Sequence, residues 1–590
     1  MQHINYNEFI ILRLKLLHKN IKTQRSIVEH CNLSLGLVNC TLSQLKSYGF
    51  LDHAGEITDS GRGILSAYQV DNAIIMAAGM SSRFAPLSYD KPKGLLQVKG
   101  EILIERQIRQ LQEAGISNII VVLGYMKEQF FYLEKKFNIK IVINEDYYRY
   151  NNTSTLMSVL SDIKNSYICS SDNYYVENPF YPYEYKSYYP VVKGSDYSTE
   201  YYVKVGSHNR ITNITIGKGE HYLIGYAYFD HTFSEKFTQI LKDEYQQVEV
   251  KKNLWEKILM NHLDVLDITA HVFDDKKIQE FDSLSDLQKF DPYYIKNTDS
   301  KILENIIKVM KCKIEDITNI VPLKEGMTNL SFSFEVNDQK YVYRHPGFGT
   351  EAYIDRKAEY SAQKIAKKYH LDDSFIYMDP KEGWKISSFI KDAHLLDYDN
   401  LLEVEIALKK IKSLHDMAIT ENCVEFDIWK KTQNYFDNIN KKGRANFEGL
   451  DNLAQDMQKL HQITESRGVE KVLCHCDLFN TNILFNDTQS YIIDWEYSGI
   501  EDPAIDVGIF IASSNYSYDE VLEILKIYNG EDVPIDHLKH FIAYVALSAY
   551  YCFAWALYQD SRGAAVGEYL YIWYKYAVFY GEKALQLYEQ

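Results

Sequence analysis

The sequence predicts a multidomain chain that combines α/β and α+β architecture in three segments, residues 1–70, 71–295 and 296–590. Length is the first observation, because 590 residues is several times the usual size of one domain. Strand-like and helix-like stretches alternate from residue 72 onward, which is typical of a doubly wound parallel sheet. A strand-rich stretch at residues 319–347 precedes a long helical remainder, which indicates a small β-lobe and a large helical lobe.

Composition indicates a folded protein rather than a disordered one, with 46% hydrophobic and 25% charged residues. The formal net charge of −17 argues against a protein that coats nucleic acid or an anionic membrane. Eight scattered cysteines and no secretory signal in the opening residues MQHINYNEFI predict a cytoplasmic protein. Residues 541–558 carry no charge over 18 positions, as a membrane span would. Their four tyrosines and the lack of basic flanks favour a buried helix, so no membrane partner is expected.

Residues 23–52 contain two short amphipathic stretches that are separated by a turn. Ser34 is a candidate N-cap for the second stretch, and Gly49 stands where that helix would end. With residues 51–65 as a β-wing, the pattern resembles a winged helix-turn-helix module. The second stretch brings only Lys46 as a basic residue, whereas a DNA-reading helix usually brings several. Docking or dimerisation through residues 1–70 is therefore favoured over nucleic-acid binding, and a homo-oligomer stays open.

The loop MAAGMSSRFAPLSYDKPKG, residues 76–94, follows the first strand of the second segment. Its small residues allow backbone N–H groups to approach a bound anion closely: Ala77, Ala78, Gly79, Ser81 and Ser82. Arg83 and Lys93 add positive charge where a nucleoside triphosphate would lie. The loop is therefore a candidate nucleotide-binding element.

The spacing of Gly79, Arg83 and Pro92-Lys93-Gly94-Leu95 resembles the AAGxxxR and PKxL signature of the sugar-phosphate and phosphocholine nucleotidyltransferases. The resemblance implies a Rossmann-like fold and transfer of a nucleotide to a phosphomonoester, with Arg83 and Lys93 as catalytic residues. It also implies two Mg²⁺-binding carboxylates, for which Asp172 and Asp282 are the candidates.

The stretch with Asn151, Asn152 and Ser154 resembles the phosphocholine cytidylyltransferase branch of that family, which uses CTP. Trp255 and Tyr226 are either an aromatic wall for a quaternary ammonium group or residues of the core.

Residues 474–485, CHCDLFNTNILF, allow either a thiol metal site or a phosphoryl-transfer loop. Cys474 and Cys476 are one residue apart and have no second pair nearby, so the spacing of a zinc or redox site is missing. The polar residues instead resemble the catalytic elements of protein kinases, with Asp477 followed by Asn482 and then Asp494. This resemblance implies that Asp477 is the catalytic base and that Asn482 and Asp494 bind Mg²⁺.

Upstream residues extend the resemblance to a protein-kinase-like fold. Thr328 and Asn329 lie in a loop that would cover the nucleotide, and Arg344 would pair with Glu359. Arginine at this position, together with the pattern I-D-x-E-Y at residues 493–497, resembles the choline and ethanolamine kinases and, more broadly, the aminoglycoside phosphotransferase fold.

The same resemblance places a choline site in the helical lobe. Trp555 and Gln559 match the W-x-x-x-Q end of an aromatic helix, and Tyr497 and Tyr571 match pocket tyrosines. A trimethylammonium group needs aromatic faces and a carboxylate, for which Glu496 is the candidate. Cys552 replaces a family tryptophan, which leaves ethanolamine or another small amino alcohol open.

The leading hypothesis is a bifunctional choline kinase and CTP:phosphocholine cytidylyltransferase that uses ATP, CTP and Mg²⁺. Its CDP-choline would serve phosphocholine decoration of surface glycans or lipids. One alternative is the same pair of reactions on ethanolamine. Another is a transcriptional regulator that senses these metabolites through degenerate enzyme domains, against which the intact Lys93, Asp477, Asn482 and Asp494 argue.

Overall fold

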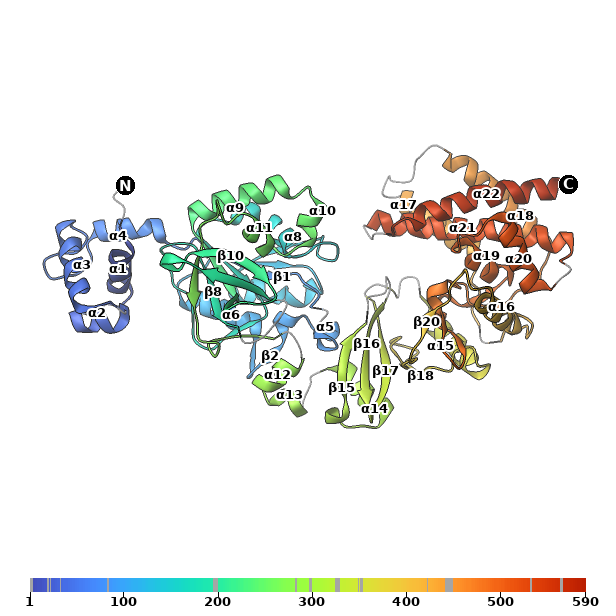
Figure 1. The fold of residues 1–590 in the computed structure, drawn as a ribbon, viewed down its shortest axis with the longest axis horizontal. Helices are drawn as coiled ribbons and strands as arrows, with labels where there is room; N and C mark the ends of the chain where they lie inside the picture. Colours follow the sequence, from blue (N-terminus) through green and yellow to red (C-terminus); the bar gives the residue numbers. More distant parts are fainter. Residues whose placement is uncertain are drawn as a thin grey trace. The chain divides into compact units, whose positions relative to one another are not determined.

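The chain divides into two compact units, Met1–Leu303 and Glu304–Gln590, in a computed structural model (Figure 1). The structure describes residues 4–18, 21, 23–31, 33–81, 84–194, 200–281, 284–296, 300–323, 329–347, 350, 354–421, 423–440, 449–530, 533–562 and 566–590.

The first unit begins with four helices, α1 (Tyr6–Leu17), α2 (Gln24–Cys31), α3 (Leu35–Ser47) and α4 (Asp59–Leu65). Ser34 caps α3 by accepting from the Leu37 amide, and Gly49 follows the helix with φ +72°, as predicted. The predicted wing is reduced to one antiparallel bridge between Leu51 and Ile57. The prediction of a β-wing is wrong for residues 59–65, which form α4. The Thr58 hydroxyl accepts from the Gly61 amide and so starts this helix. The winged-helix assignment stays a prediction.

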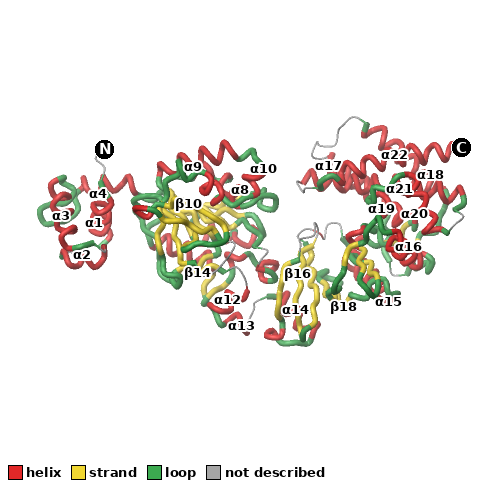
Figure 2. Tube along the Cα trace, in the orientation of Figure 1, coloured by secondary structure: helices red, strands yellow, loops and turns green. Residues whose placement is uncertain are grey.

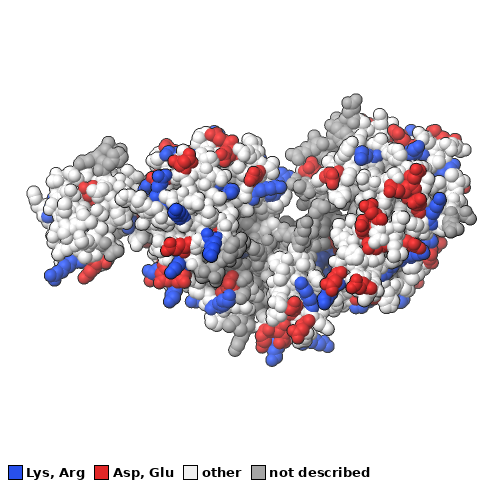
Figure 3. Space-filling model, viewed as in Figure 1, with Lys and Arg blue, Asp and Glu red and all other residues white. Residues whose placement is uncertain are grey.

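This helical module contacts the sheet domain that follows it. Tyr68 stacks on Tyr185 with ring centroids 5.6 Å apart, and Phe9 also contacts that ring. Arg13 reaches the buried carboxylate of Glu184 at 3.2 Å. Little positive charge gathers on the face of the module that Figure 3 shows. The contacts make the module part of the first unit, whereas nucleic-acid binding gains no support from this face.

Ten of the described strands form the central sheet of the first unit (Figure 2). Its parallel part runs in the order β5 (Lys140–Ile143), β4 (Ile119–Leu123), β1 (Asn72–Ala77) and β6 (Ser166–Ser170). Beyond β6 the sheet continues in antiparallel pairs through β12 (Tyr226–Phe229), β8 (Tyr188–Lys193), β11 (His221–Leu223), β9 (Tyr201–Val205) and β10 (Ile211–Ile216), while β13 (Thr269–Val272) pairs with β8. The predicted parallel pairing is therefore confirmed for β5, β4, β1 and β6, and β13 also pairs in parallel with β8. The other pairs among the described strands of this sheet are antiparallel.

Helices cover both faces of this sheet and form two cores. On one face α6 (Leu103–Glu113) buries Ile104, Ile108 and Leu111 against β1 and β4. On the other face lie α8 (Asn152–Met157), α9 (His231–Glu244) and α11 (Glu256–Asn261). The unit ends with β14 (Ile278–Glu280), which pairs with β7 (Asn173–Tyr175), and with α12 (Leu284–Phe290) and α13 (Tyr293–Lys296).

The second unit starts with a small lobe built on an antiparallel sheet of five described strands. Their order is β15 (Thr318–Pro322), β16 (Asn329–Val336), β17 (Gln339–Pro346), β19 (Lys385–Ser388) and β18 (Phe375–Met378). Helix α14 (Lys301–Met310) precedes this sheet, and α15 (Arg356–Lys368) follows β17. The small β-lobe predicted from residues 319–347 is confirmed.

The large lobe is mainly helical, as predicted. Its helices are α16 (Leu401–His415), α17 (Ile428–Asn440), α18 (Leu450–Ser466), α19 (Ala504–Ala512), α20 (Tyr518–Asn529), α21 (Ile535–Arg562) and α22 (Tyr569–Glu589). Its short strands are β20 (His394–Leu395), β21 (Val472–Cys474), β22 (Ile483–Phe485), β23 (Ser490–Ile492) and β24 (Gly499–Glu501). Among the described helices, α21 alone is long and apolar enough to cross a membrane, and 83% of its most apolar window is buried. Packing within the lobe accounts for this composition.

Gly508 lets α19 and α21 approach closely. A Cβ atom at this position would lie 2.5 Å from the Ser548 hydroxyl and 2.6 Å from the Tyr544 carbonyl oxygen. We expect Gly508→Ala to destabilise the second unit by about 1–3 kcal/mol, because helix backbone cannot move aside cheaply. Thermal unfolding checks this. Gly581→Ala is the control, because its Cβ would meet only the flexible end of Met457. An equal loss of stability in both variants would contradict the explanation.

Candidate active sites

The first candidate site lies where β1 and β6 end. These neighbouring strands are parallel, so the loop after β1 and the residues after β6 meet at one edge of the sheet. The Ser171 amide donates to the Met76 carbonyl at 3.3 Å, which holds the two strand ends together. Asp172 is thereby brought to the small-residue loop, as expected for a ligand crevice at the carboxyl ends of parallel strands.

Lys93 approaches Asp172 from a separate segment. Its Nζ lies 2.9 Å from Asp172 Oδ2, and the lysine side chain is buried. A Cβ on the next residue, Gly94, would lie 3.1 Å from the Ser171 hydroxyl, so glycine permits this close approach. The two predicted residues Lys93 and Asp172 are therefore direct neighbours in one site.

The predicted loop residues are described in part. Ala77 and Ala78 are buried, Gly79 is exposed with open space beside it, and Ser81 has a left-handed φ of +49°. This leaves backbone next to Gly79 accessible to a ligand. The predicted residues Ser82, Arg83 and Asp282 lie outside the described residues.

Trp255 and Tyr226 belong to the core. Trp255 is 1% exposed and stacks on Tyr189, while Tyr226 is 1% exposed among other tyrosines. An aromatic wall needs an open ring face, which neither residue offers. The stretch with Asn151 and Asn152 packs against the start of α11, where Asn152 accepts from the Trp255 amide.

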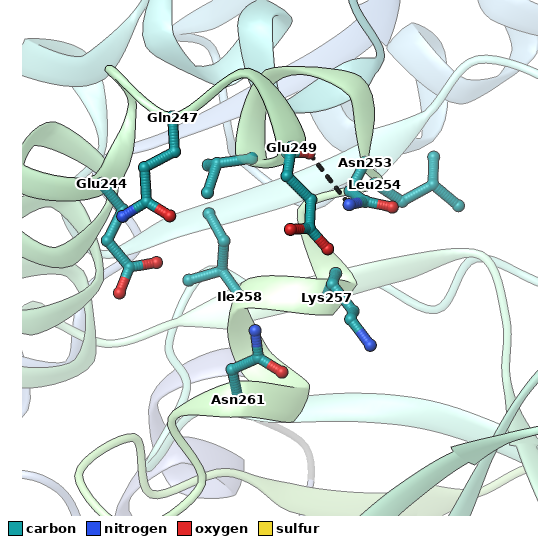
Figure 4. A pocket seen from close by; sticks show the side chains of 9 residues that line it. Glu244, Gln247, Glu249, Asn253, Leu254, Lys257, Ile258 and Asn261 are labelled. Atoms are coloured by element: carbon teal, nitrogen blue, oxygen red, sulfur yellow. Dashed lines mark hydrogen bonds between the residues drawn. The ribbon is translucent and has the colours of Figure 1, made fainter.

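A separate cavity of about 160 Å³ lies between α9, α11 and the short helix α10 (Val248–Lys252), as Figure 4 shows. The Asn253 side chain beside it donates to the Glu249 carbonyl at 2.9 Å. None of the predicted site residues lines it, and its volume is below that of typical small-molecule sites.

The second candidate site is built on the loop after β21. Asp477 is held by Asn482, whose side-chain amide donates to the Asp477 carboxylate and to its carbonyl oxygen, both at 2.9 Å. Burial, followed by the nearby carboxylates of Asp494 and Glu496, raises the pKa of Asp477 well above its usual range. Cys476, just before Asp477, has a left-handed φ of +60°. Such strain at a non-glycine residue is common at functional sites.

Asp506 braces the same loop from α19. Its carboxylate accepts from the amides of His475 at 2.8 Å and Cys476 at 2.7 Å. His415 contacts the same carboxylate at 3.0 Å. These bonds fix the backbone that carries Asp477.

A buried cluster of charges faces this loop from the small lobe. Arg344 contacts Glu359, as predicted, and also Asp494 at 3.0 Å and Glu496 at 3.4 Å. Burial opposes the charge of Arg344, but these carboxylates outweigh it and raise its pKa. Burial would raise the pKa of Asp494, but Lys385 and Arg344 lower it. The cluster therefore holds Asp494 as a carboxylate.

Sequence analysis missed two members of this cluster. Lys385 pairs with Arg344 across β17 and β19, and its Nζ lies 3.8 Å from Asp494. Arg356 contacts Glu359 at 3.0 Å and Glu496 at 3.5 Å. No motif marks either residue, so only the fold brings them together.

One predicted choline-site residue has a setting that the sequence did not indicate. Glu496, the predicted choline carboxylate, lies in the charge cluster and accepts from the Asn329 side chain at 2.8 Å. Its charge is thus already engaged by Arg344, Arg356 and Asn329. Thr328 lies outside the described residues. Asp494 and Asn482 offer the hard oxygen donors that Mg²⁺ prefers, as does Asp172 in the first site.

Aromatic residues adjoin the Asp477 loop in the large lobe. Trp555 of α21 contacts Trp573 of α22 with centroids 6.2 Å apart, and Trp573 contacts Phe479 at 6.0 Å. Tyr497 packs against the same core. Tyr571 is 64% exposed, and its recorded ring contact is with Lys575. Trp573 contacts Phe479 of the Asp477 loop, although no sequence motif marks this tryptophan.

The cysteines beside Asp477 are buried filler residues. Burial raises the pKa of the Cys474 and Cys476 thiols well above their usual range. Cys474, His415 and Asp506 do come within 4.8 Å of one another, but both Asp506 oxygens already accept hydrogen bonds. The burial of both cysteines agrees with the interpretation of residues 474–485 as a phosphoryl-transfer loop rather than a thiol metal site.

Each unit contains a segment that matches a known family model. Residues 73–179 match the MobA-like NTP transferase domain, and residues 320–549 match choline/ethanolamine kinase. The chain is 33% identical over 220 residues to choline-phosphate cytidylyltransferase of Streptococcus pneumoniae, covering 37% of this chain and 96% of that protein.

Two further relatives divide between the units. The chain is 32% identical over 229 residues to 2-aminoethylphosphonate cytidylyltransferase of Lancefieldella rimae, covering 38% of this chain and 93% of that protein. It is 25% identical over 255 residues to Protein LicA of Haemophilus influenzae, covering 41% and 94% respectively. The chain therefore combines a cytidylyltransferase-like domain with a choline kinase-like domain.

Thiol chemistry tests the interpretation of the cysteines. Four cysteines are buried, namely Cys169, Cys474, Cys476 and Cys552, whereas Cys40 is exposed. Because a raised pKa keeps a thiol protonated at pH 8, we expect an aromatic disulfide reagent to modify Cys40 first and the buried four only after unfolding. Cys40→Ser should remove the fast phase, and Cys474→Ser should leave it unchanged. Rapid labelling of Cys474 or Cys476, located by peptide mass spectrometry, would contradict this.

Proposed function

Because the chain belongs to the choline-phosphate cytidylyltransferase family and carries a choline/ethanolamine kinase domain, we propose that it phosphorylates choline and then couples phosphocholine to CTP. The kinase step uses ATP, and the transferase step yields CDP-choline and pyrophosphate. The observation that carries this proposal is the presence of both domains in one chain, since the product of one reaction is the substrate of the other.

In the kinase unit Asp477 takes the proton of the choline hydroxyl while that oxygen attacks the γ-phosphorus of ATP and ADP leaves. Its contact with Asn482 and the bracing by Asp506 support this role, because a base must be held within hydrogen-bond reach of its proton. Arg344 and Lys385 provide positive charge for the phosphates. Asp494 and Asn482 would hold Mg²⁺, which neutralises triphosphate charge when it is bound.

In the transferase unit a phosphate oxygen of phosphocholine attacks the α-phosphorus of CTP, and pyrophosphate leaves. Lys93 offsets negative charge on the phosphates, which its buried contact with Asp172 supports. Backbone near Gly79 approaches the triphosphate, and Arg83 adds charge there. Asp172, together with Asp282, would hold Mg²⁺.

The alcohol that accepts the first phosphoryl group is either choline or ethanolamine. A 2-aminoethylphosphonate cytidylyltransferase is 32% identical to this chain, so the transferase half alone does not select phosphocholine. The kinase domain favours an amino alcohol, because it needs a hydroxyl group to phosphorylate. The partly buried ring of Trp555 favours choline, whose trimethylammonium group binds aromatic faces. Ethanolamine is the second candidate.

The direct test supplies the protein with ATP, CTP and Mg²⁺ and offers choline and ethanolamine in competition. Phosphorus NMR should detect phosphocholine first and CDP-choline later. Conversion of ethanolamine alone would make ethanolamine the substrate in place of choline. No conversion of either alcohol would refute the proposal.

Two variants should separate the activities. Asp477→Asn removes the base and should lower choline phosphorylation at least about 100-fold, while CDP-choline still forms from added phosphocholine. Lys93→Ala should do the reverse, with a loss of about 100-fold in the transferase step. Each variant is the control for the other. Loss of both activities in a folded variant would contradict the division of the chain.

Trp555 and Tyr571 are two predicted rings of the choline site that differ in their surroundings. We expect Trp555→Leu to raise the KM for choline roughly tenfold with little change in the KM for ATP, because a cation–π contact of this partly buried ring is lost. Tyr571→Ala should change the choline KM less than about twofold, since that ring is exposed. Steady-state kinetics measure both, and circular dichroism checks folding. A larger effect at Tyr571 would restore it as a wall of the choline site.

A further inference from the structure

Three hydrogen bonds connect the segment that carries Lys93 to the end of the first unit. The Ser300 hydroxyl donates to Asp90 Oδ2 at 2.9 Å. The Lys99 amide donates to Asp291 Oδ2 at 2.6 Å, and the Tyr294 hydroxyl donates to the Gln97 carbonyl at 2.7 Å. Because Asp90 precedes Lys93 and the other two contacts follow it, the segment is held on both sides.

The contact at Asp90 is also the start of helix α14. The same carboxylate oxygen accepts from the Ile302 amide at 3.3 Å, and the Ser300 hydroxyl accepts from the Leu303 amide at 3.4 Å. Ser300, Ile302 and Leu303 are each 1% exposed. Asp90 therefore satisfies donors of the first turn of α14 in the way a capping residue does.

Helix α14 leads into the kinase unit. Beyond residue 303 its Asn305 side chain donates to the Tyr343 hydroxyl at 3.2 Å, and Tyr343 precedes Arg344 in β17. The helix thus makes one contact three residues from Lys93 and, in the other unit, one contact next to Arg344. The linker into the second unit therefore begins with residues 300–303, which are part of the first unit.

We propose that Asp90 is a positioning residue for the cytidylyltransferase step. It anchors the Lys93 segment to the first turn of α14, so the linker into the kinase forms part of the frame of the transferase site. This inference rests on the proposed function of the first unit.

The physical reason is the precision that Lys93 needs. Lys93 lies on a short 3-10 turn, Lys93–Leu95, rather than on a long helix or strand. Its local support consists of bonds such as Lys91 amide to Leu87 carbonyl and Leu96 amide to Lys93 carbonyl. Catalytic groups must be held within about 0.5 Å of their productive position. Removing the Asp90 contact would let this segment move without unfolding the sheet.

The test compares Asp90→Ala with Asp90→Asn in the full chain. Asparagine keeps an oxygen that can accept from Ser300 and Ile302, so Asp90→Asn should retain CDP-choline formation within about twofold. Asp90→Ala should lower kcat/KM for CTP roughly tenfold, mostly through kcat, while choline phosphorylation stays unchanged. Hydrogen exchange at the amides of Lys91, Leu95 and Leu96 should accelerate in Asp90→Ala alone.

Asn305→Ala is the matched control, because it removes the other side-chain contact of the same helix and should leave the transferase step unchanged. Unchanged exchange and turnover in Asp90→Ala would overturn the inference, as would an equal loss in Asp90→Asn. A general loss of stability of the first unit, seen in its unfolding, would assign Asp90 a structural role instead and also overturn it. Exchange is measured without substrate, so its outcome stands even if wild-type protein makes no CDP-choline.

Discussion

The contact of Arg344 with Glu359, Asp494 and Glu496 is the interaction on which the kinase site depends. These groups are largely withdrawn from water, and an isolated buried charge would cost several kcal/mol. Opposite charges must therefore surround each one. Arg356 and Lys385 complete this balance, and together the six side chains join β17, α15 and β19 of the small lobe to the Asp494 segment of the large lobe. Loss of Arg344 would leave the buried carboxylates of Glu359 and Glu496 with fewer opposite charges around them.

The transferase site uses a smaller version of the same arrangement. Lys93 pairs with Asp172, as Arg344 pairs with Asp494. In each site a cation proposed to meet nucleotide phosphates contacts a carboxylate proposed to bind Mg²⁺. Such a pair keeps both charges compensated before a ligand arrives. Asp172 and Asp494 would hold Mg²⁺, and Lys93 and Arg344 would offset the negative charge of the phosphates.

The two proposed reactions share an intermediate whose chemistry suits both units. Phosphorylation of choline gives a phosphomonoester, and nucleotidyl transfer requires one. The first step creates a phosphate group, whose negative charge Lys93 can offset in the second step. The quaternary ammonium group is unchanged in both steps. The partly buried rings of Trp555 and Phe479 are the proposed faces for that group in the kinase unit.

Short-range sequence patterns indicate the positions of the signature loops and of the apolar helix. The sequence alone determined the buried nature of residues 541–558. It also predicted the two signature loops with Lys93, Asp172, Asp477, Asn482 and Asp494, because these depend on spacing and local composition. Tertiary structure decided the antiparallel extension of the sheet, the helix at residues 59–65 and the burial of Trp255. It also decided the places of Arg356, Lys385, Trp573 and Asp90. Their partners are distant in the chain, so the contacts exist only after folding brings separate elements together.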